Sequence, residues 1–169
     1  MNSIKPVRPI EQCRAQAANW CAGGPPVLAL RVQFGIAHDA LPSRQRMRSW
    51  AKAALLTDVH VTLRLVGARE GRKLNRDFRG KDYATNVLTF TYPDFEPLSG
   101  DIVLCAPVIA QEAREQRKPI AAHYAHLIVH GMLHLQGYDH ENDNDAGVME
   151  TLEADIVSKL GYADPYETR

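Results

Sequence analysis

The chain has 169 residues, of which 45% are hydrophobic and 24% charged, and its formal net charge is zero. This length suits one domain with its own core, and the composition is that of ordinary globular proteins. The neutral charge argues against bulk electrostatic binding of nucleic acid, so any contact with RNA has to come from a local basic patch.

Cysteine use and the absence of targeting segments indicate a cytoplasmic protein. The three cysteines, Cys13, Cys21 and Cys105, show neither metal-binding nor redox spacing, which suits a reducing compartment. No stretch is long and apolar enough to cross a membrane, and the first residues lack the core of a signal peptide. We therefore expect no contact with membranes.

The first half of the chain alternates between helical and strand patterns. We expect residues 1–26 to be an N-terminal extension, with a short helix over 10–21 that stops at the Gly-Gly-Pro-Pro run. Apolar residues at every second position then predict strands over 27–36 and 59–66. Helical periodicity predicts an amphipathic helix over 44–56 and a basic helix over 68–78.

The second half is mostly helical. It contains predicted strands over 86–92 and 100–105 and predicted helices over 107–117, 120–136 and 143–160, followed by a frayed tail over 163–169. The helix over 120–136 is apolar around most of its circumference, which predicts a central position. Together the patterns indicate one α/β (α+β) domain over 27–162, with a mixed sheet of about four strands.

The most informative segment runs from residue 130 to residue 140. His130 and His134 are four residues apart, so on a helix they share one face, with Cβ atoms roughly 5–6 Å apart, which suits one zinc ion. Gly137 can adopt the left-handed conformation that ends a helix, and the returning chain can bring His140 to the same ion. A single such histidine is usually a hydrogen-bonded core residue, but this spacing of three predicts metal ligands with an open fourth position.

The residue after the first histidine distinguishes this motif from that of a protease. The ligand spacing is that of the metzincin proteases, whose motif begins His-Glu, and that glutamate takes the proton from zinc-bound water. Gly131 occupies the position here and has no side chain for this task. A glycine inside a helix costs about 1 kcal/mol relative to alanine. We expect it to allow either the close approach of another chain or a substrate, or tight packing against a neighbouring strand.

Polar side chains flank the predicted ligands. His126 lies one helical turn before His130 and could supply a fourth nitrogen or hydrogen-bond near the metal; an open catalytic site favours the second role. His123 continues the same face toward the N-terminus of the helix. Asp139 could orient an imidazole, act as a base, or bond the backbone of a turn, and the sequence leaves these roles open.

A second cluster is basic and contains Arg69, Arg72, Lys73, Arg76, Arg79 and Lys81. Such a run could hold a phosphate backbone or be no more than a solvated helix face. Arg79 differs from the others because it lies just past the predicted helix, beside Gly80 and ahead of a strand. A guanidinium there could clamp a phosphate with two hydrogen bonds close to the metal.

Three segments resemble the motifs of a known family. Residues 130–140, His-Gly-Met-Leu-His-Leu-Gln-Gly-Tyr-Asp-His, resemble the signature of the YbeY family of bacterial endoribonucleases. Residues 74–90 resemble its second motif and residues 100–102 its third, in the order that the family has them. The resemblance extends from about Val27 to Leu160 and leaves residues 1–26 unaccounted for.

The resemblance implies a small α/β protein with one zinc ion on three histidines that cleaves single-stranded RNA. It also implies a part in 16S ribosomal RNA 3′-end maturation and in ribosome quality control, with ribosomal RNA as substrate and ribosomal proteins as candidate partners. By motif position, His130, His134 and His140 carry over as ligands, and Arg79 carries over as the basic residue needed for activity. We count His130 and Arg79 as the catalytic pair.

The chain departs from the family pattern at two positions of the second motif. Asn86 stands where the family often has Asp, and Thr89 stands where it often has Ser. We expect both changes to leave the site intact.

Three functions compete at this stage. The leading hypothesis is a zinc-dependent endoribonuclease, because attack by water or by the ribose 2′-hydroxyl does not require the protease glutamate. The second is a metalloprotease, which the ligand spacing favours and Gly131 disfavours. The third is a non-enzymatic ribosome-assembly factor with a structural metal. Nitrogen ligands also suit nickel, cobalt or iron, and the sequence does not specify an oligomeric state.

Overall fold

The computed structural model describes residues 24–37, 40–92, 94–140 and 143–167. The helix predicted over 10–21 and most of the predicted extension lie outside these residues. Within the described parts, none of the helices combines the length and apolarity needed to span a membrane.

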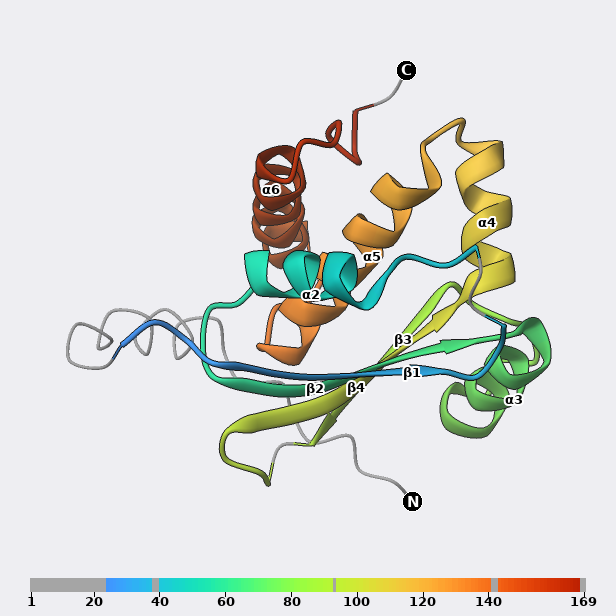
Figure 1. Cartoon of the computed structure of the whole chain (residues 1–169), viewed down its shortest axis with the longest axis horizontal. Coiled ribbons are helices and arrows are strands. Elements are labelled where there is room, and N and C mark those ends of the chain that lie inside the picture. Colours follow the sequence, from blue (N-terminus) through green and yellow to red (C-terminus); the bar gives the residue numbers. More distant parts are fainter. Residues whose placement is uncertain (1–23, 38–39, 93, 141–142, 168–169) are drawn as a thin grey trace.

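A mixed four-stranded sheet forms the base of the fold, as the alternating patterns predict (Figure 1). Strands β1 (Leu28–Phe34), β2 (Val59–Val66) and β4 (Leu98–Cys105) are parallel, and β3 (Val87–Tyr92) runs antiparallel to β4. The spatial order is β1-β2-β4-β3, which makes β3 an edge strand. The predicted α/β fold class is therefore confirmed.

The helices within the described residues match the predicted segments, with small shifts at their ends. They are α2 (Arg44–Ala53), α3 (Ala68–Arg79), α4 (Ala106–Glu115), α5 (Ile120–Leu135) and α6 (Asp143–Lys159). Helix α2 begins after Ser43, whose hydroxyl accepts from the backbone N–H of Arg46 at 3.3 Å. This N-cap satisfies one of the donors that a helix leaves free at its first turn.

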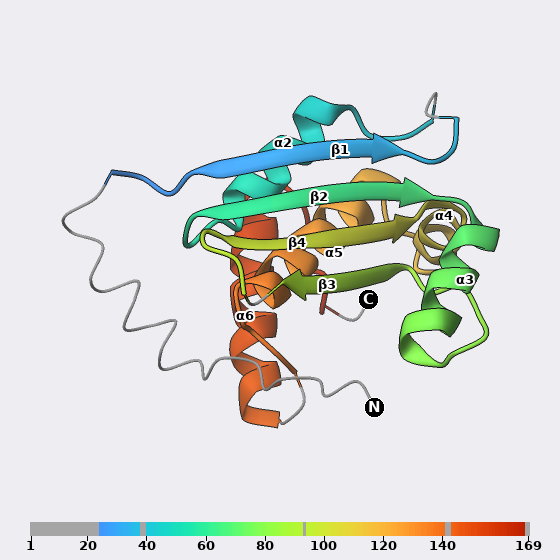
Figure 2. The same ribbon diagram turned by 90° about the horizontal axis from the view of Figure 1, so that it is seen from below.

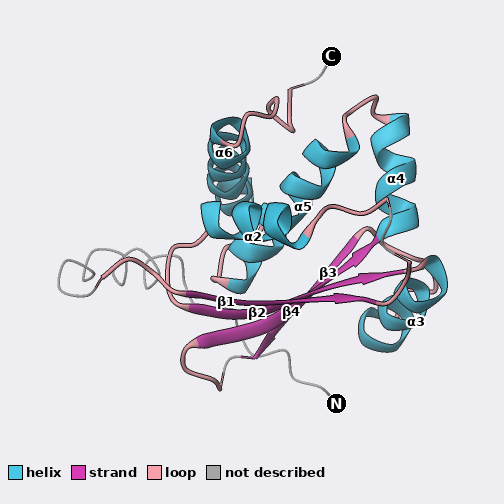
Figure 3. Cartoon of the chain, in the orientation of Figure 1, coloured by secondary structure: helices cyan, strands magenta, loops and turns pink. Residues whose placement is uncertain are grey.

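The register of the sheet aligns most of its buried apolar residues on one face. Partners such as Val32, Leu63 and Ile102 are aligned across β1, β2 and β4, and Leu63 and Ile102 are fully buried. Helices α2, α5 and α6 cover this face, whereas α3 lies on the opposite face, at the end where the parallel strands finish (Figures 1 and 2). Figure 3 shows the resulting layer of helices above the sheet. The main core lies between the two layers.

Helix α5 is central, as its apolar circumference predicts, and it approaches the sheet very closely at Gly131. A Cβ atom added at Gly131 would lie 2.9 Å from two side-chain atoms of Ile102 in β4. Such a distance is shorter than a van der Waals contact between carbon atoms allows. Tight packing against a neighbouring strand therefore explains this glycine, one of the two reasons that the sequence left open.

The buried amide of Gln136 connects the end of α5 to the end of α2. Its Nε2 donates to the carbonyls of Ala54 (2.8 Å) and Met132 (2.9 Å). Its Oε1 accepts from the N–H groups of Leu56 (2.7 Å) and Thr57 (3.2 Å). These bonds hold residues 54–57 in a loop, which explains why α2 stops at Ala53 rather than at the predicted residue 56.

Two glycine-to-alanine substitutions isolate the contact between α5 and the sheet. Gly147 lies inside α6 and has open space around a built Cβ, so Gly147→Ala should raise the free energy of unfolding by about 1 kcal/mol. Gly131→Ala gains the same helix preference but crowds Ile102. The free energy of unfolding of Gly131→Ala should therefore be lower than that of Gly147→Ala by roughly 1–3 kcal/mol.

Chemical denaturation of both variants measures this difference. Adding Ile102→Val, which removes the Cδ1 methyl, should recover part of the loss at Gly131 and leave Gly147→Ala without a comparable gain. Equal stabilisation by the two alanines would contradict the close contact.

Candidate metal centre

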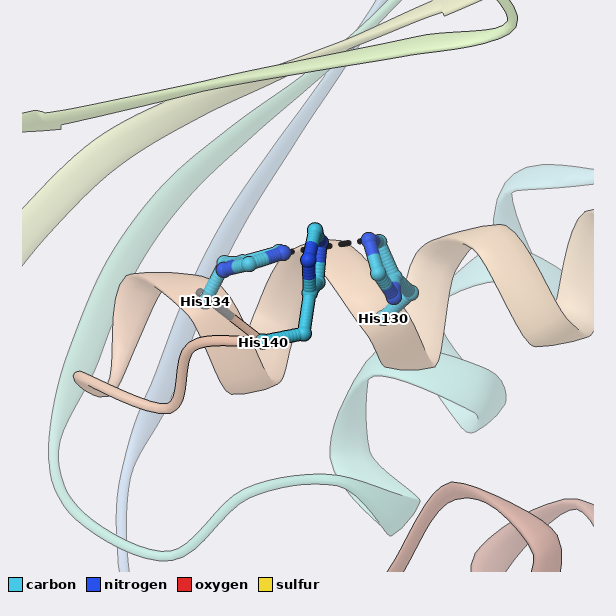
Figure 4. A group of neighbouring side chains, drawn as sticks. All are labelled: His130, His134 and His140. Atoms are coloured by element: carbon cyan, nitrogen blue, oxygen red, sulfur yellow. Dashed lines mark hydrogen bonds between the residues drawn. The ribbon is translucent and has the colours of Figure 1, made fainter. Parts of the chain in front are cut away.

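The structure brings His130, His134 and His140 together (Figure 4). The ligand atoms of these imidazoles lie within 4.8 Å of one another. Two of the rings project from α5, and their Nε2 atoms are 3.1 Å apart. The third ring comes from the segment after α5, and its centroid lies 4.9 Å from that of His134 and 5.6 Å from that of His130.

The turn after α5 explains how the third imidazole reaches the first two. Gly137 has φ +93°, the left-handed conformation that the sequence predicts. The N–H of Tyr138 donates to the carbonyl of Leu133 at 3.0 Å, and that of Gly137 donates to the carbonyl of His134 at 3.0 Å. These bonds close the helix in a Schellman-type arrangement and send the chain back along it.

Asp139 stabilises the same turn. Its Oδ1 accepts from the backbone N–H of His140 at 2.7 Å, the turn role that the sequence offered as one alternative. Among the described residues, no hydrogen bond joins this carboxylate to an imidazole ring. The side chain therefore orients the backbone that carries the third histidine.

A buried carboxylate that the motif did not reveal holds the first histidine. Glu153 of α6 is fully buried, and its Oε1 lies 2.7 Å from Nδ1 of His130. Its Oε2 accepts from the Tyr166 hydroxyl and lies 2.9 Å from Nε2 of His126. His126 thus has the hydrogen-bonding role, one of the two predicted, because its Nε2 faces the carboxylate.

The environment of Glu153 keeps this carboxyl ionised. Burial by itself raises its pKa, but hydrogen bonds from His126 and His130 outweigh burial and bring the pKa down to about 2. An ionised carboxylate only accepts hydrogen bonds, so Nδ1 of His130 carries the proton. In the neutral form of this ring, Nε2 presents a lone pair to the centre of the histidine group.

The same argument applies to His134. Its Nδ1 lies 2.9 Å from the carbonyl oxygen of Tyr138, which can only accept, so Nε2 of His134 is also unprotonated. Burial, reinforced by His130 and His140, lowers the pKa of His134 to about 4, so this ring stays neutral near pH 7.

When both rings are neutral, their Nε2 lone pairs face each other at 3.1 Å and repel unless a cation lies between them. Two imidazole nitrogens bound tetrahedrally to one zinc at about 2.0–2.1 Å would be roughly 3.3 Å apart, close to the observed separation. The residues present therefore fit a divalent metal ion.

His123 belongs to a separate network on α5. Its Nε2 lies 2.7 Å from Oε2 of Glu112 in α4, and burial lowers the pKa of His123. Glu112 also accepts from Nδ2 of Asn86 at 3.0 and 3.2 Å. Asn86, one of the two departures from the family pattern, thus contacts Glu112 and not the histidine group.

The C-terminal segment packs against this region, so the expectation of a frayed tail is wrong for residues 163–167. The ring of Tyr166 lies edge-on to His126, with centroids 5.5 Å apart, and its hydroxyl donates to Glu153. Lys118 donates from Nζ to the carbonyl of Pro165 at 2.7 Å. Burial, together with the bond to Glu153, raises the pKa of Tyr166, so the phenol remains a donor.

Arg79 lies beside the edge strand and not within the histidine group. The sequence placed Arg79 just past the helix, but α3 extends one residue further and ends at Arg79, and Gly80 follows with φ +70°. Its Nη2 donates to the carbonyl of Thr89 in β3 at 3.4 Å. Strand β3 packs against α5, so this edge strand contacts both Arg79 and the helix that carries His130 and His134. Within the described ranges, no hydrogen bond or ion pair joins this guanidinium to the histidines.

Residues 38–161 match the family model described as Endoribonuclease YbeY. The chain belongs to the YbeY family. It is 59% identical over 142 residues to the Endoribonuclease YbeY of Aromatoleum aromaticum, covering 82% of this chain and 92% of the relative. It is 59% identical over 137 residues to that of Nitrosomonas eutropha, covering 81% of this chain and 97% of the relative. The resemblance that the motifs indicated is thereby confirmed.

The fold also matches a solved structure. The solution structure of a protein from Thermotoga maritima superposes with a TM-score of 0.52 at 26% identity, covering 82% of this chain and 99% of that one. The match supports a single α/β domain of the kind described above.

Substitution of Glu153 tests whether this carboxylate orients His130. Glu153→Gln keeps the shape but loses the charge that fixes the ring tautomer, so zinc affinity should fall by roughly 10–100-fold. Competition with a chromophoric chelator measures the dissociation constant. Glu150→Gln, on an exposed position of the same helix, is the matched control and should bind zinc like the unmodified protein. Unchanged affinity in Glu153→Gln would show that the carboxylate only stabilises the fold.

Proposed function

We propose that this protein cleaves single-stranded RNA with one zinc ion held by His130, His134 and His140, and that Arg79 binds the phosphate at the cleaved bond. Membership of the YbeY family makes the chain an endoribonuclease and a hydrolase. What the proposal adds is the metal, its ligands, the preference for single strands and the target. We infer that the target is the 3′ end of precursor 16S ribosomal RNA, in maturation and ribosome quality control in the cytoplasm, with ribosomal proteins as partners.

The observation that carries the proposal is the pair of Nε2 atoms that face each other at 3.1 Å. Glu153 and the carbonyl of Tyr138 set the tautomers of the two neutral rings, which leaves both Nε2 lone pairs available to a metal ion. A divalent ion at this point supplies Lewis-acid polarisation of the phosphate and acidifies water. Neutral imidazoles are the common zinc ligands in proteins, which supports zinc as the metal.

Arg79 is suited to binding a phosphate. Its guanidinium is exposed, and its bond to the Thr89 carbonyl uses only Nη2. The remaining N–H groups of the planar fork are available for two parallel hydrogen bonds to phosphate oxygens. Charge that develops on the phosphate during cleavage would be stabilised there, whether water or the ribose 2′-hydroxyl attacks.

The position of the histidines favours single-stranded substrates. His130 and His134 are half-buried, and His140 is exposed beside them. A flexible strand can bring one phosphate close to half-buried side chains more readily than a stiff A-form duplex, and unpaired bases can turn away.

The packing at residue 131 argues against the protease alternative. The glutamate of the metzincin motif would have to project from this position, where even a Cβ atom collides with Ile102. The chain therefore has neither the glutamate nor the space for one in this packing. Among the described residues, no contact specifically favours a role as an assembly factor without activity.

A cleavage assay with three proteins tests the proposal. The substrate is a single-stranded RNA that spans the 3′ end of precursor 16S ribosomal RNA, with the same RNA annealed to its complement as the comparison. The unmodified protein should bind about one zinc and cut the single strand. His134→Ala should lose both zinc and cutting. Arg79→Ala should keep its zinc and cut on the order of 10²-fold more slowly, because a preorganised donor to the phosphate is lost.

Metal content, measured on the same samples, separates the two kinds of loss. Chelation should stop cutting by the unmodified protein, and added zinc should restore it. Equal cutting by all three proteins would indicate a contaminating nuclease. In that case the assembly-factor hypothesis would replace the proposal.

A further inference from the structure

The solvent face of α3 carries a row of cations, and only the last of them, Arg79, has a part in the proposed cleavage. The row consists of Arg69, Arg72, Lys73, Arg76 and Arg79. At 3.6 residues per turn these positions share about a third of the helix circumference. The buried residues Gly71 and Asn75 lie on the other side, toward the sheet.

Four of these cations line a groove of about 710 Å³, together with Ala68 and Ala84. The groove exists because the chain folds back along α3 after Gly80. Nδ2 of Asn75 donates to the carbonyl of Tyr83 at 2.8 Å, and Arg72 forms two hydrogen bonds with Asp82 at 2.7 and 2.8 Å. These contacts hold residues 82–84 beside the helix as the second wall.

The groove retains positive charge after its ion pairs are counted. Arg72 pairs with Asp82, and Lys73 and Arg76 both contact Asp77. Arg69 forms no ion pair within the described residues. Two carboxylates therefore face four cations, in a chain whose net charge is zero. Ion pairs between exposed side chains are weak because water and salt screen them, so a polyanion can compete for the cations.

The row leads toward the proposed site of cleavage. Arg69 and Arg79 are ten residues apart on one helix, which corresponds to about 15 Å along its axis. Arg79 reaches Thr89 at the edge strand, and that strand packs against α5. Tyr83, the neighbour of the lining residue Ala84, is 54% exposed, and an exposed aromatic ring can stack on a base.

We propose that this groove binds the phosphodiester backbone of the RNA several nucleotides away from the bond that is cut. The inference rests on the proposed function, since it takes single-stranded RNA as the substrate. A row of cations with an exposed aromatic ring matches the way proteins bind single strands without reading their sequence. An acidic protein segment would use the charges but would not need the aromatic ring.

Two double variants test the groove. Arg69→Gln with Lys73→Gln removes two cations whose side chains hold neither the loop nor the sheet. The control is Lys52→Gln with Lys159→Gln, which removes the same charge from α2 and α6 at the opposite face of the sheet. It also matches the groove variant in its ion pairs, because Lys159 pairs with Asp155 as Lys73 pairs with Asp77. Cleavage of a 20-nucleotide single-stranded RNA is followed at several salt concentrations, and thermal melts show that each variant is folded.

The groove variant should raise KM about tenfold with little change in kcat, because ground-state contacts to two phosphates are lost. The slope of log KM against log salt should become shallower by about 1.4, from about 0.7 for each phosphate on a single strand. The effect should shrink as the RNA is shortened below the span of the groove. The control variant should match the unmodified protein.

The outcomes separate this inference from the proposed function. If the unmodified protein cuts no RNA, the proposed function fails. If it cuts RNA but both variants have its KM and salt slope, the row is only a solvated helix face. Equal weakening by both variants would mean a bulk charge effect, and a raised KM with an unchanged slope would mean that no phosphate contact was lost. Either result would contradict the proposal that the groove binds the RNA backbone.

Discussion

Helix α5 lies directly against the sheet, and the rest of the molecule is arranged around this contact. One side of the helix touches Ile102 at Gly131, and residues on its circumference fill the core between the sheet, α2 and α6. Because the helix is fixed against β4, the imidazoles that project from it have a defined position relative to the edge strand. The basic end of α3 contacts that same strand, so the sheet connects the histidines and Arg79 without a direct bond between them.

The carboxylate of Glu153 also holds α5 in place, from the side that faces α6. It accepts hydrogen bonds from two imidazoles of α5 and from the phenol of Tyr166, and so ties α6 and the C-terminal segment to the metal helix. A buried, ionised carboxylate is stable only when its acceptor sites are used, and this one has three donors. The same bonds that stabilise the charge also fix the tautomer of His130. Folding of the C-terminal region and preparation of the site are therefore coupled.

Much of this arrangement could be predicted from sequence, because its signals are local. Period-two alternation identified the strands, and the i, i+4 histidines with Gly137 predicted both the turn and the convergence of the rings. Other features depended on contacts between distant segments. Glu153 is 23 residues from its partner His130, although its position between Met149 and Ile156 on the apolar stripe of α6 was a usable signal. Nothing in the local pattern indicated that Tyr166 would pack on His126.

The close fit between Gly131 and Ile102 bears on how easily such a site could change its chemistry. The histidine spacing is shared with a class of proteases that require glutamate at the second position of the motif. Here a single mutation to glutamate would meet the side chain of a buried strand residue before it could offer a base. A compensating reduction at position 102 would be needed first, and that change would open a cavity in the core. In this chain, the packing of one helix on one strand therefore blocks a one-step change to the protease motif, although the three ligands have the same spacing.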